Sequence, residues 1–115
     1  MTEVDVESLI SRLAGGKVYP YVVPMDKQGK PKPVPPWVVF SLVSQSDGDV
    51  FCGQAEELTT VQIDVYANTI KEARSIREEA LAALGSLSPG DVMKQQFRDA
   101  DTGLFRAMLE VQIID

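Results

Sequence analysis

The sequence contains no histidine among its 115 residues and a single cysteine, Cys52. Without histidine, the serine–histidine and cysteine–histidine arrangements that activate a nucleophile are excluded. A zinc site lacks plausible ligands, and Cys52 has no second thiol with which to form a disulfide within the chain. We interpret Cys52 as a small, half-buried hydrophobic residue, and we expect no metal, no cofactor and no enzymatic activity.

Long apolar runs are also missing, since no stretch approaches the ~20 residues that a membrane-spanning helix requires. Met1 is followed at once by Thr2, Glu3 and Asp5, with no basic segment leading into an apolar one, so we expect no secretory signal and a cytoplasmic location. The formal net charge of -6 opposes contact with nucleic acid phosphates. We therefore expect a soluble protein with no membrane partner and no specific nucleic acid partner.

A chain of this length has room for one domain around one core, which we place at residues 1–115. Apolar residues recur with helical spacing in two stretches and alternate in others, which predicts an α+β fold. The expected order is α-β-β-β-α-β, with a small, mostly antiparallel sheet of about four strands packed with two helices. The helices are predicted over residues 4–13 and 69–84, and the strands over 18–23, 37–44, 59–67 and 104–114. Residues 50–52 are a candidate short strand, and the pattern over 92–97 is ambiguous.

The stretch from Thr59 to Leu84 is the most clearly specified part of the chain. Alternation along its strand turns one set of side chains toward the core, namely Val61, Ile63, Val65 and Ala67. The other set, Thr60, Gln62, Asp64 and Tyr66, faces water or a second subunit. Asn68 or Thr69 is expected to cap the helix that follows, and Thr69 with Glu72 has the capping-box spacing. The buried stripe of this helix is predicted to be Ile70, Ala73, Ile76, Ala80, Leu81 and Leu84.

Five of the seven prolines lie between Pro24 and Pro36, in a stretch without periodicity that we interpret as a long, extended loop. Pro33 and Pro36 have the spacing of proline-rich ligands, but a simple connection between two strands explains the same residues. The loop is basic and suited to contact an acidic surface of a neighbouring protein, through Lys27, Lys30 and Lys32.

The two segments that flank this loop are rich in strand-forming residues. Pro20 is expected to place the preceding strand at an edge of the sheet, or to bend it. The segment Trp37-Val38-Val39-Phe40 is apolar on both faces of its predicted strand, as is typical near the middle of a sheet or at a subunit interface.

Two pairs of carboxylates are the remaining candidates for chemistry, either hydrolysis or cation binding. Asp47 and Asp49 flank Gly48, and Asp99 and Asp101 precede Gly103. Glycine beside aspartate favours tight turns, so we interpret both pairs as hairpin turns. The segment Gly15-Gly16-Lys17 lacks the earlier glycine and the hydroxyl of a phosphate-binding loop, and it is expected to end the first helix.

Taken together, several segments resemble the tail-completion proteins of long-tailed phages. The most specific is Val61-Gln62-Ile63-Asp64-Val65-Tyr66-Ala67, followed by Lys71-Glu72-Ala73-Arg74. The short first helix, the proline-interrupted loop and Trp37-Val38-Val39-Phe40 agree with it. The element order is also similar to that of the tail-terminator proteins, which form rings, commonly of six subunits, that cap the finished tail tube and present a surface for the head.

This resemblance implies a structural protein that caps the tail tube and forms part of the head–tail joining interface. Its implied location is the virion tail, and the host cytoplasm during assembly. The implied partners are further copies of itself in a ring, which the resemblance implies is a hexamer, the tail tube protein and the head–tail connector protein. Candidate contact residues are Lys27, Lys30, Lys32, Trp37, Gln62, Asp64 and Tyr66. The alternative function is a small ligand- or protein-binding regulatory module of similar α+β layout.

Overall fold

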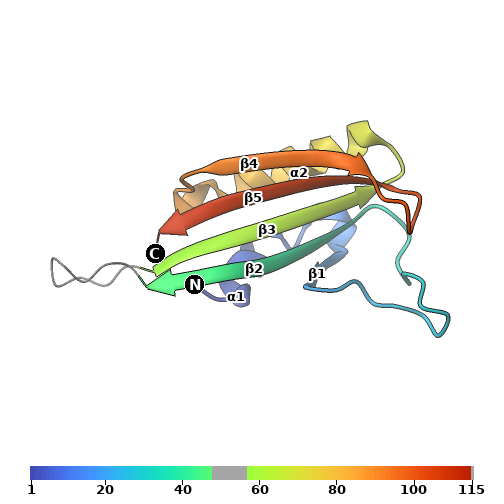
Figure 1. Cartoon of the computed structure of the whole chain (residues 1–115), viewed down its shortest axis with the longest axis horizontal. Coiled ribbons are helices and arrows are strands. Elements are labelled where there is room, and N and C mark those ends of the chain that lie inside the picture. The colour runs from blue at the N-terminus through green and yellow to red at the C-terminus, as the bar shows by residue number, and fades with distance from the viewer. Residues whose placement is uncertain (48–56, 115) are drawn as a thin grey trace, which may run out of the picture.

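The computed structural model describes residues 1–47 and 57–114. Its elements are α1 (Glu3–Ile10), a 3-10 turn (Leu13–Gly16), β1 (Val18–Pro20), β2 (Trp37–Asp47), β3 (Glu57–Ala67), α2 (Ile70–Ala83), a second 3-10 turn (Leu84–Leu87), β4 (Val92–Arg98) and β5 (Phe105–Ile114). The strands form one sheet in the order β1-β2-β3-β5-β4 (Figure 1). Neighbouring strands are antiparallel except for β1 and β2. The predicted α+β class with a mostly antiparallel sheet is confirmed.

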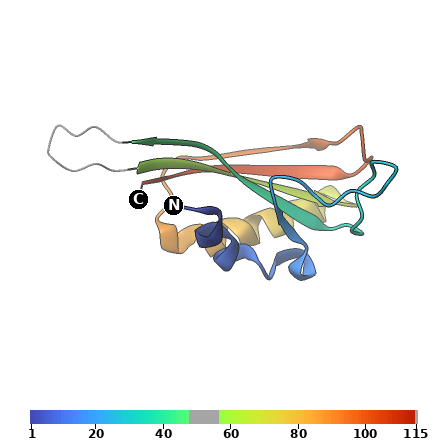
Figure 2. The same cartoon turned by 90° about the horizontal axis from the view of Figure 1, so that it is seen from below.

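Both helices lie on one face of the sheet (Figure 2), and the main core fills the space between the two layers. As the alternation predicts, β3 contributes the fully buried Val61, Ile63, Val65 and Ala67. The predicted stripe of α2 is correct for Ala73, Ile76, Ala80 and Leu84. Ile70 and Leu81 are only half buried, although Leu81 still packs against the core, and the prediction misses Arg77, which is only 5% exposed.

The start of α2 and the end of α1 can each be described from the contacts and backbone angles of a few residues. The Thr69 hydroxyl accepts a hydrogen bond from the Glu72 amide at 3.1 Å, so Thr69 is the cap of α2. The first helix is shorter than predicted, since α1 ends at Ile10. The backbone of Ala14, Gly15 and Gly16 has positive φ angles, a left-handed conformation that a continuing helix does not adopt.

The strands differ from the prediction in three places. The sheet has five strands rather than about four, because the ambiguous residues 92–98 pair with β5 as β4. β1 ends at Pro20 rather than at Val23, and the next residue, Tyr21, has a positive φ angle; the expected position of this strand at the sheet edge is correct. β2 continues past the predicted end at residue 44 as far as Asp47, so Asp47 belongs to the strand rather than to the predicted turn. The predicted turn at Gly48, the candidate strand over 50–52 and Cys52 lie outside the described residues.

Candidate assembly interface

Neither of the described helices covers the opposite face of the sheet (Figure 2), although Val23, in the segment after β1, packs on it against Trp37 and Val39. Residues that sit opposite one another across paired strands share a face, so the register defines this surface. Trp37 pairs with Tyr66 and Tyr66 with Arg106, which pairs in turn with Phe97. We call this surface the open face. Its central residues are Trp37, Val39, Ser41, Gln62, Asp64, Tyr66, Arg106, Met108, Glu110, Met93, Gln95 and Phe97.

A network of charge-assisted hydrogen bonds lies in the middle of the open face. Asp64 is only 4% exposed and accepts hydrogen bonds from Arg106 Nε at 2.9 Å and from Gln62 Nε2 at 2.8 Å. Arg106 Nη2 also lies 2.9 Å from Asp64 Oδ1. The guanidinium lies over the rings of Tyr66 and Phe97, 5.5 Å and 5.2 Å from their centroids. These contacts hold the polar and aromatic groups in one arrangement.

Aromatic stacking extends this arrangement toward β2. The rings of Trp37 and Tyr66 are stacked with centroids 5.5 Å apart, and they pack in a second apolar cluster with Val23 and Val39. Trp37 is 2% exposed, and its Nε1 has no hydrogen-bond acceptor among the described residues. Partial burial raises the pKa of the Tyr66 hydroxyl.

The open face is hollowed beside this cluster. A groove of about 440 Å³ runs between the segment after β1 and the turn before β5. Its lining includes the four predicted contact residues Trp37, Gln62, Asp64 and Tyr66. The turn itself is ordered as predicted, because Asp99 Oδ2 accepts from the Thr102 amide at 3.1 Å. Among residues 1–47 and 57–114, no group of three or more His, Cys, Asp or Glu side chains could hold a metal ion.

The three predicted loop lysines are separate from this groove. Lys27, Lys30 and Lys32 are exposed, and only Lys30 lines a second, adjoining hollow. The loop is folded back on itself rather than extended throughout, because the Asp26 amide donates to the Lys30 carbonyl at 2.7 Å and Met25 bridges Pro31. The lysines thus sit on a hairpin-like projection at one end of the sheet.

Arg106 and Phe97 are site residues that the sequence analysis missed. The alternation over residues 105–113 places Arg106 on the outer side of its strand, but its partner depends on which strand pairs with β5. Phe97 lies in the segment that was ambiguous, so nothing in its neighbourhood assigned it to a face.

Comparison with known proteins places the chain in a family. No curated protein sequence matches it. One chain of a solved structure titled "Virion of native gene transfer agent (GTA) particle" aligns with 99% of this chain and 87% of its own length. The TM-score is 0.48 and the sequence identity is 14%, a similarity too low to support an argument about function. Among the described residues, no helix is long and apolar enough to cross a membrane. The profile of the family described as "Tail completion protein gp17" matches residues 7–114, and the protein therefore belongs to this family of phage tail-completion proteins.

Proposed function

We propose that this protein caps the end of the phage tail tube and forms part of the interface that joins the tail to the head. Membership of a tail-completion family supports a structural role in assembly of the virion tail. The observation that carries the proposal is the open face, which no described helix covers. On it the partly exposed Tyr66 and Arg106 are held in place by the stacked Trp37 ring and by the ion pair with Asp64.

In the proposed assembly, copies of the chain form a ring, as a hexamer, on the last layer of the tail tube. The ring stops tube growth and presents a surface to the head–tail connector protein. Trp37, Gln62, Asp64 and Tyr66 lie in a contact with a neighbouring subunit or partner. Lys27, Lys30 and Lys32 contact an acidic surface of a neighbouring protein, because their projection is basic and exposed.

The composition of the open face supports burial against protein. Met93, Phe97 and Ile114 project from it and are 48%, 43% and 64% exposed. A single exposed apolar side chain is ordinary, but these three share one face of the sheet, and Phe97 lies directly opposite Arg106. Because Asp64 and Arg106 neutralise each other, a protein that covers them leaves no charge without a partner.

Electron microscopy of tail tubes polymerised in the presence of this protein tests the proposal. We expect tubes that stop growing and carry the protein at one end. Met108→Lys, in the centre of the open face, should fold but lose this capping, because it places a long cation where a partner packs. Ala82→Lys adds the same charge at an exposed position of α2 and should cap like the wild type. Bare tube ends with the wild-type protein would contradict the proposal.

A further inference from the structure

The sheet has two outer edges that lack a strand partner among the described residues. On one side, β4 pairs only with β5 along its seven residues. On the other side, β1 pairs only with Val38, Val39 and Phe40 of β2. Among the described residues, the outer edge of β2 therefore has no strand partner from Ser41 to Asp47, over as many residues as β4 contains, although the Tyr21 side chain lies beside it at Leu42. Edges of this kind present backbone N–H and C=O groups to another strand.

The directions of the two edges suit contact between successive copies. β2, β3, β5 and β4 alternate in direction, so β4 runs opposite to β2 within one copy (Figure 1). A rotation about an axis along the strands preserves these directions. β4 of one copy then meets β2 of the next copy in antiparallel orientation, and repetition of this head-to-tail contact generates a ring if the rotation closes.

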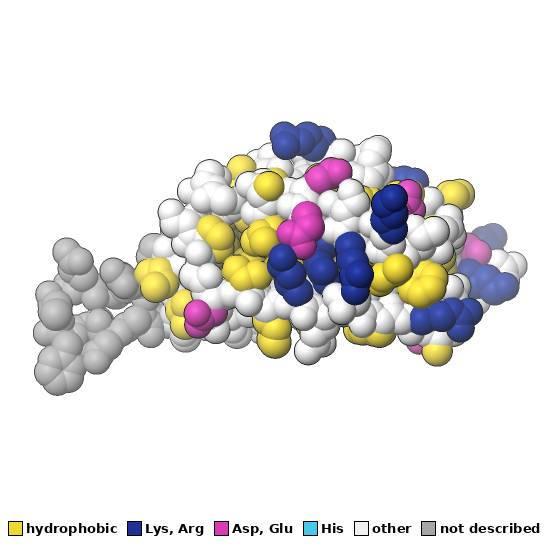
Figure 3. All heavy atoms as spheres, turned by 90° about the horizontal axis from the view of Figure 1, so that it is seen from above, with side chains coloured by type: hydrophobic (Ala, Val, Ile, Leu, Met, Phe, Trp, Pro, Cys, Tyr) yellow, Lys and Arg dark blue, Asp and Glu magenta, His cyan; other side chains and the backbone are white. Residues whose placement is uncertain are grey.

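Basic side chains accompany the β4 edge. Lys94 Nζ lies 2.9 Å from Glu78 Oε1, which places this side of α2 along β4. Arg74 lies one helical turn before Glu78 on the same side, toward the end of β4 that carries Arg98. Both arginines are exposed. Figure 3, which views the molecule from the β4 side, shows Lys and Arg side chains across this surface, with a smaller number of Asp and Glu side chains among them. We call β4 with Arg74, Lys94 and Arg98 the basic flank.

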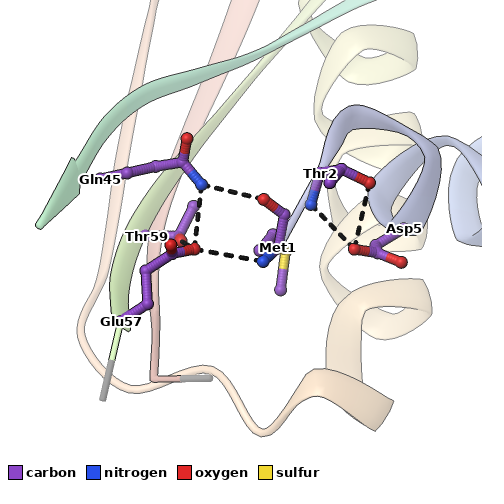
Figure 4. A network of polar contacts seen from close by, with 6 residues as sticks. All are labelled: Met1, Thr2, Asp5, Gln45, Glu57 and Thr59. Carbon is purple, nitrogen blue, oxygen red and sulfur yellow. Dashed lines mark hydrogen bonds and ion pairs between the residues drawn. The ribbon is translucent and has the colours of Figure 1, made fainter. Parts of the chain in front are cut away.

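Acidic side chains accompany the open half of β2. Gln45 Nε2 donates to the Met1 carbonyl at 2.9 Å, which places the start of α1 against this half of the strand (Figure 4). Glu3 accepts a hydrogen bond from the Tyr21 hydroxyl, just beyond β1, so this side of α1 faces the β2 edge. Glu7 lies one turn later on the same side and is exposed. We call the open half of β2 with Glu3 and Glu7 the acidic flank.

We propose that the basic flank of one copy docks on the acidic flank of the next copy, with β4 and β2 extending the sheet across the contact. The inference rests on the proposed ring and names the two surfaces that close it. Opposite charges on the two flanks favour this contact, whereas two identical flanks repel each other. This local attraction also offsets the self-repulsion expected from a net charge of -6.

Charge reversal on each flank tests the contact. Arg74→Glu makes the basic flank more acidic, and Glu7→Lys makes the acidic flank more basic. Both variants change exposed side chains and should keep the circular dichroism spectrum of the wild type. Each should need at least about tenfold more protein to form rings in light scattering, because like charges then face each other. Glu79→Lys, on a different side of α2, is the matched control and should assemble like the wild type.

Mixing the two variants separates this contact from a general loss of assembly. In a ring that alternates the variants, every contact joins a basic flank to an acidic flank, so an equimolar mixture should recover ring formation. If wild-type rings form and both variants assemble as readily, the flank assignment is wrong but the ring stands. A mixture that assembles no better than the separate variants also overturns the assignment. A wild-type protein that stays monomeric, both alone and on tail tubes, overturns the ring and this contact together.

Discussion

Asp64 is a carboxylate held away from water on the sheet face that no described helix covers. Its charge is satisfied by Arg106 and by the side-chain amide of Gln62, both on the same face. Arg106 in turn lies over two aromatic rings, which restrict its motion. The group is therefore ordered before any partner arrives, which lowers the entropy cost of binding.

Removal of Arg106 tests this arrangement. Arg106→Gln should lower the free energy of unfolding by about 1–3 kcal/mol, because it removes the charged partner of the nearly buried Asp64. Urea unfolding measures the change. Adding Asp64→Asn should recover part of the loss, since no charge then remains without a partner. Equal stability of the wild type and Arg106→Gln would show that the pair contributes nothing.

Ionisation of the Tyr66 hydroxyl makes the free energy of unfolding depend on pH in the alkaline range. Burial raises the pKa of its hydroxyl above the value of 10.0 expected in the unfolded chain. Its contribution to stability is complete below that pH and is lost as the pH rises through the folded pKa. Tyr66→Phe should leave the unfolding free energy unchanged within about 0.5 kcal/mol at neutral pH, because no hydrogen bond of the hydroxyl is present among the described residues. Its loss of stability above pH 10 should be smaller than that of the wild type, as thermal unfolding across this range would show.

Alternation was enough to predict which residues of β3 face the open side, including Gln62, Asp64 and Tyr66. It was not enough to find Arg106 as the partner of Asp64. That contact joins residues 42 positions apart and depends on strand order, which the local pattern does not contain.

At the scale of elements, β4 is the strand that depends most on other parts of the chain. All seven of its side chains are exposed, so no apolar alternation marks it in the sequence. Contacts from α2 help to hold it: Arg77 Nη1 donates to the Gln95 carbonyl and to the Gln96 side chain, both at 3.0 Å. By contrast, β3, β5 and α2 carry clear periodic patterns, because each buries one side against the core. Those elements could be predicted, whereas β4 could not.

Replacement of Arg77 should therefore weaken the attachment of β4. Arg77→Ala is expected to lower the free energy of unfolding by at least about 2 kcal/mol, because two hydrogen bonds to a charged, buried group are lost. Hydrogen exchange should increase first in β4. Arg74→Ala, exposed on the same helix, should change stability by no more than about 0.5 kcal/mol. Unchanged exchange in β4 would contradict this role of Arg77.

Substitutions in the projecting loop are expected to affect assembly rather than stability. Simultaneous Lys27→Glu, Lys30→Glu and Lys32→Glu should leave the melting temperature unchanged, because all three side chains are exposed. Joining of tails to heads should fall, and wild-type joining should weaken with added salt. Lys71→Glu, an exposed reversal on α2, is the control. Normal joining by the triple variant would remove the loop from the interface.

At the scale of the molecule, the helices cover one face of the sheet and leave the other face and parts of both edges for contacts (Figures 1 and 2). The sequence resemblance pointed to the family, and the profile match over residues 7–114 confirms it. The two flanks could not be predicted from the sequence, because their charges come together only when α1 lies beside β2 and α2 lies beside β4.

We propose that this protein ends the tail tube as a ring. Electron microscopy of tail tubes assembled with and without the wild-type protein tests it most directly. We predict that tubes made with the protein stop growing and carry a closed ring of its copies at one end. Tubes that keep growing, with no protein at their ends, would contradict the account.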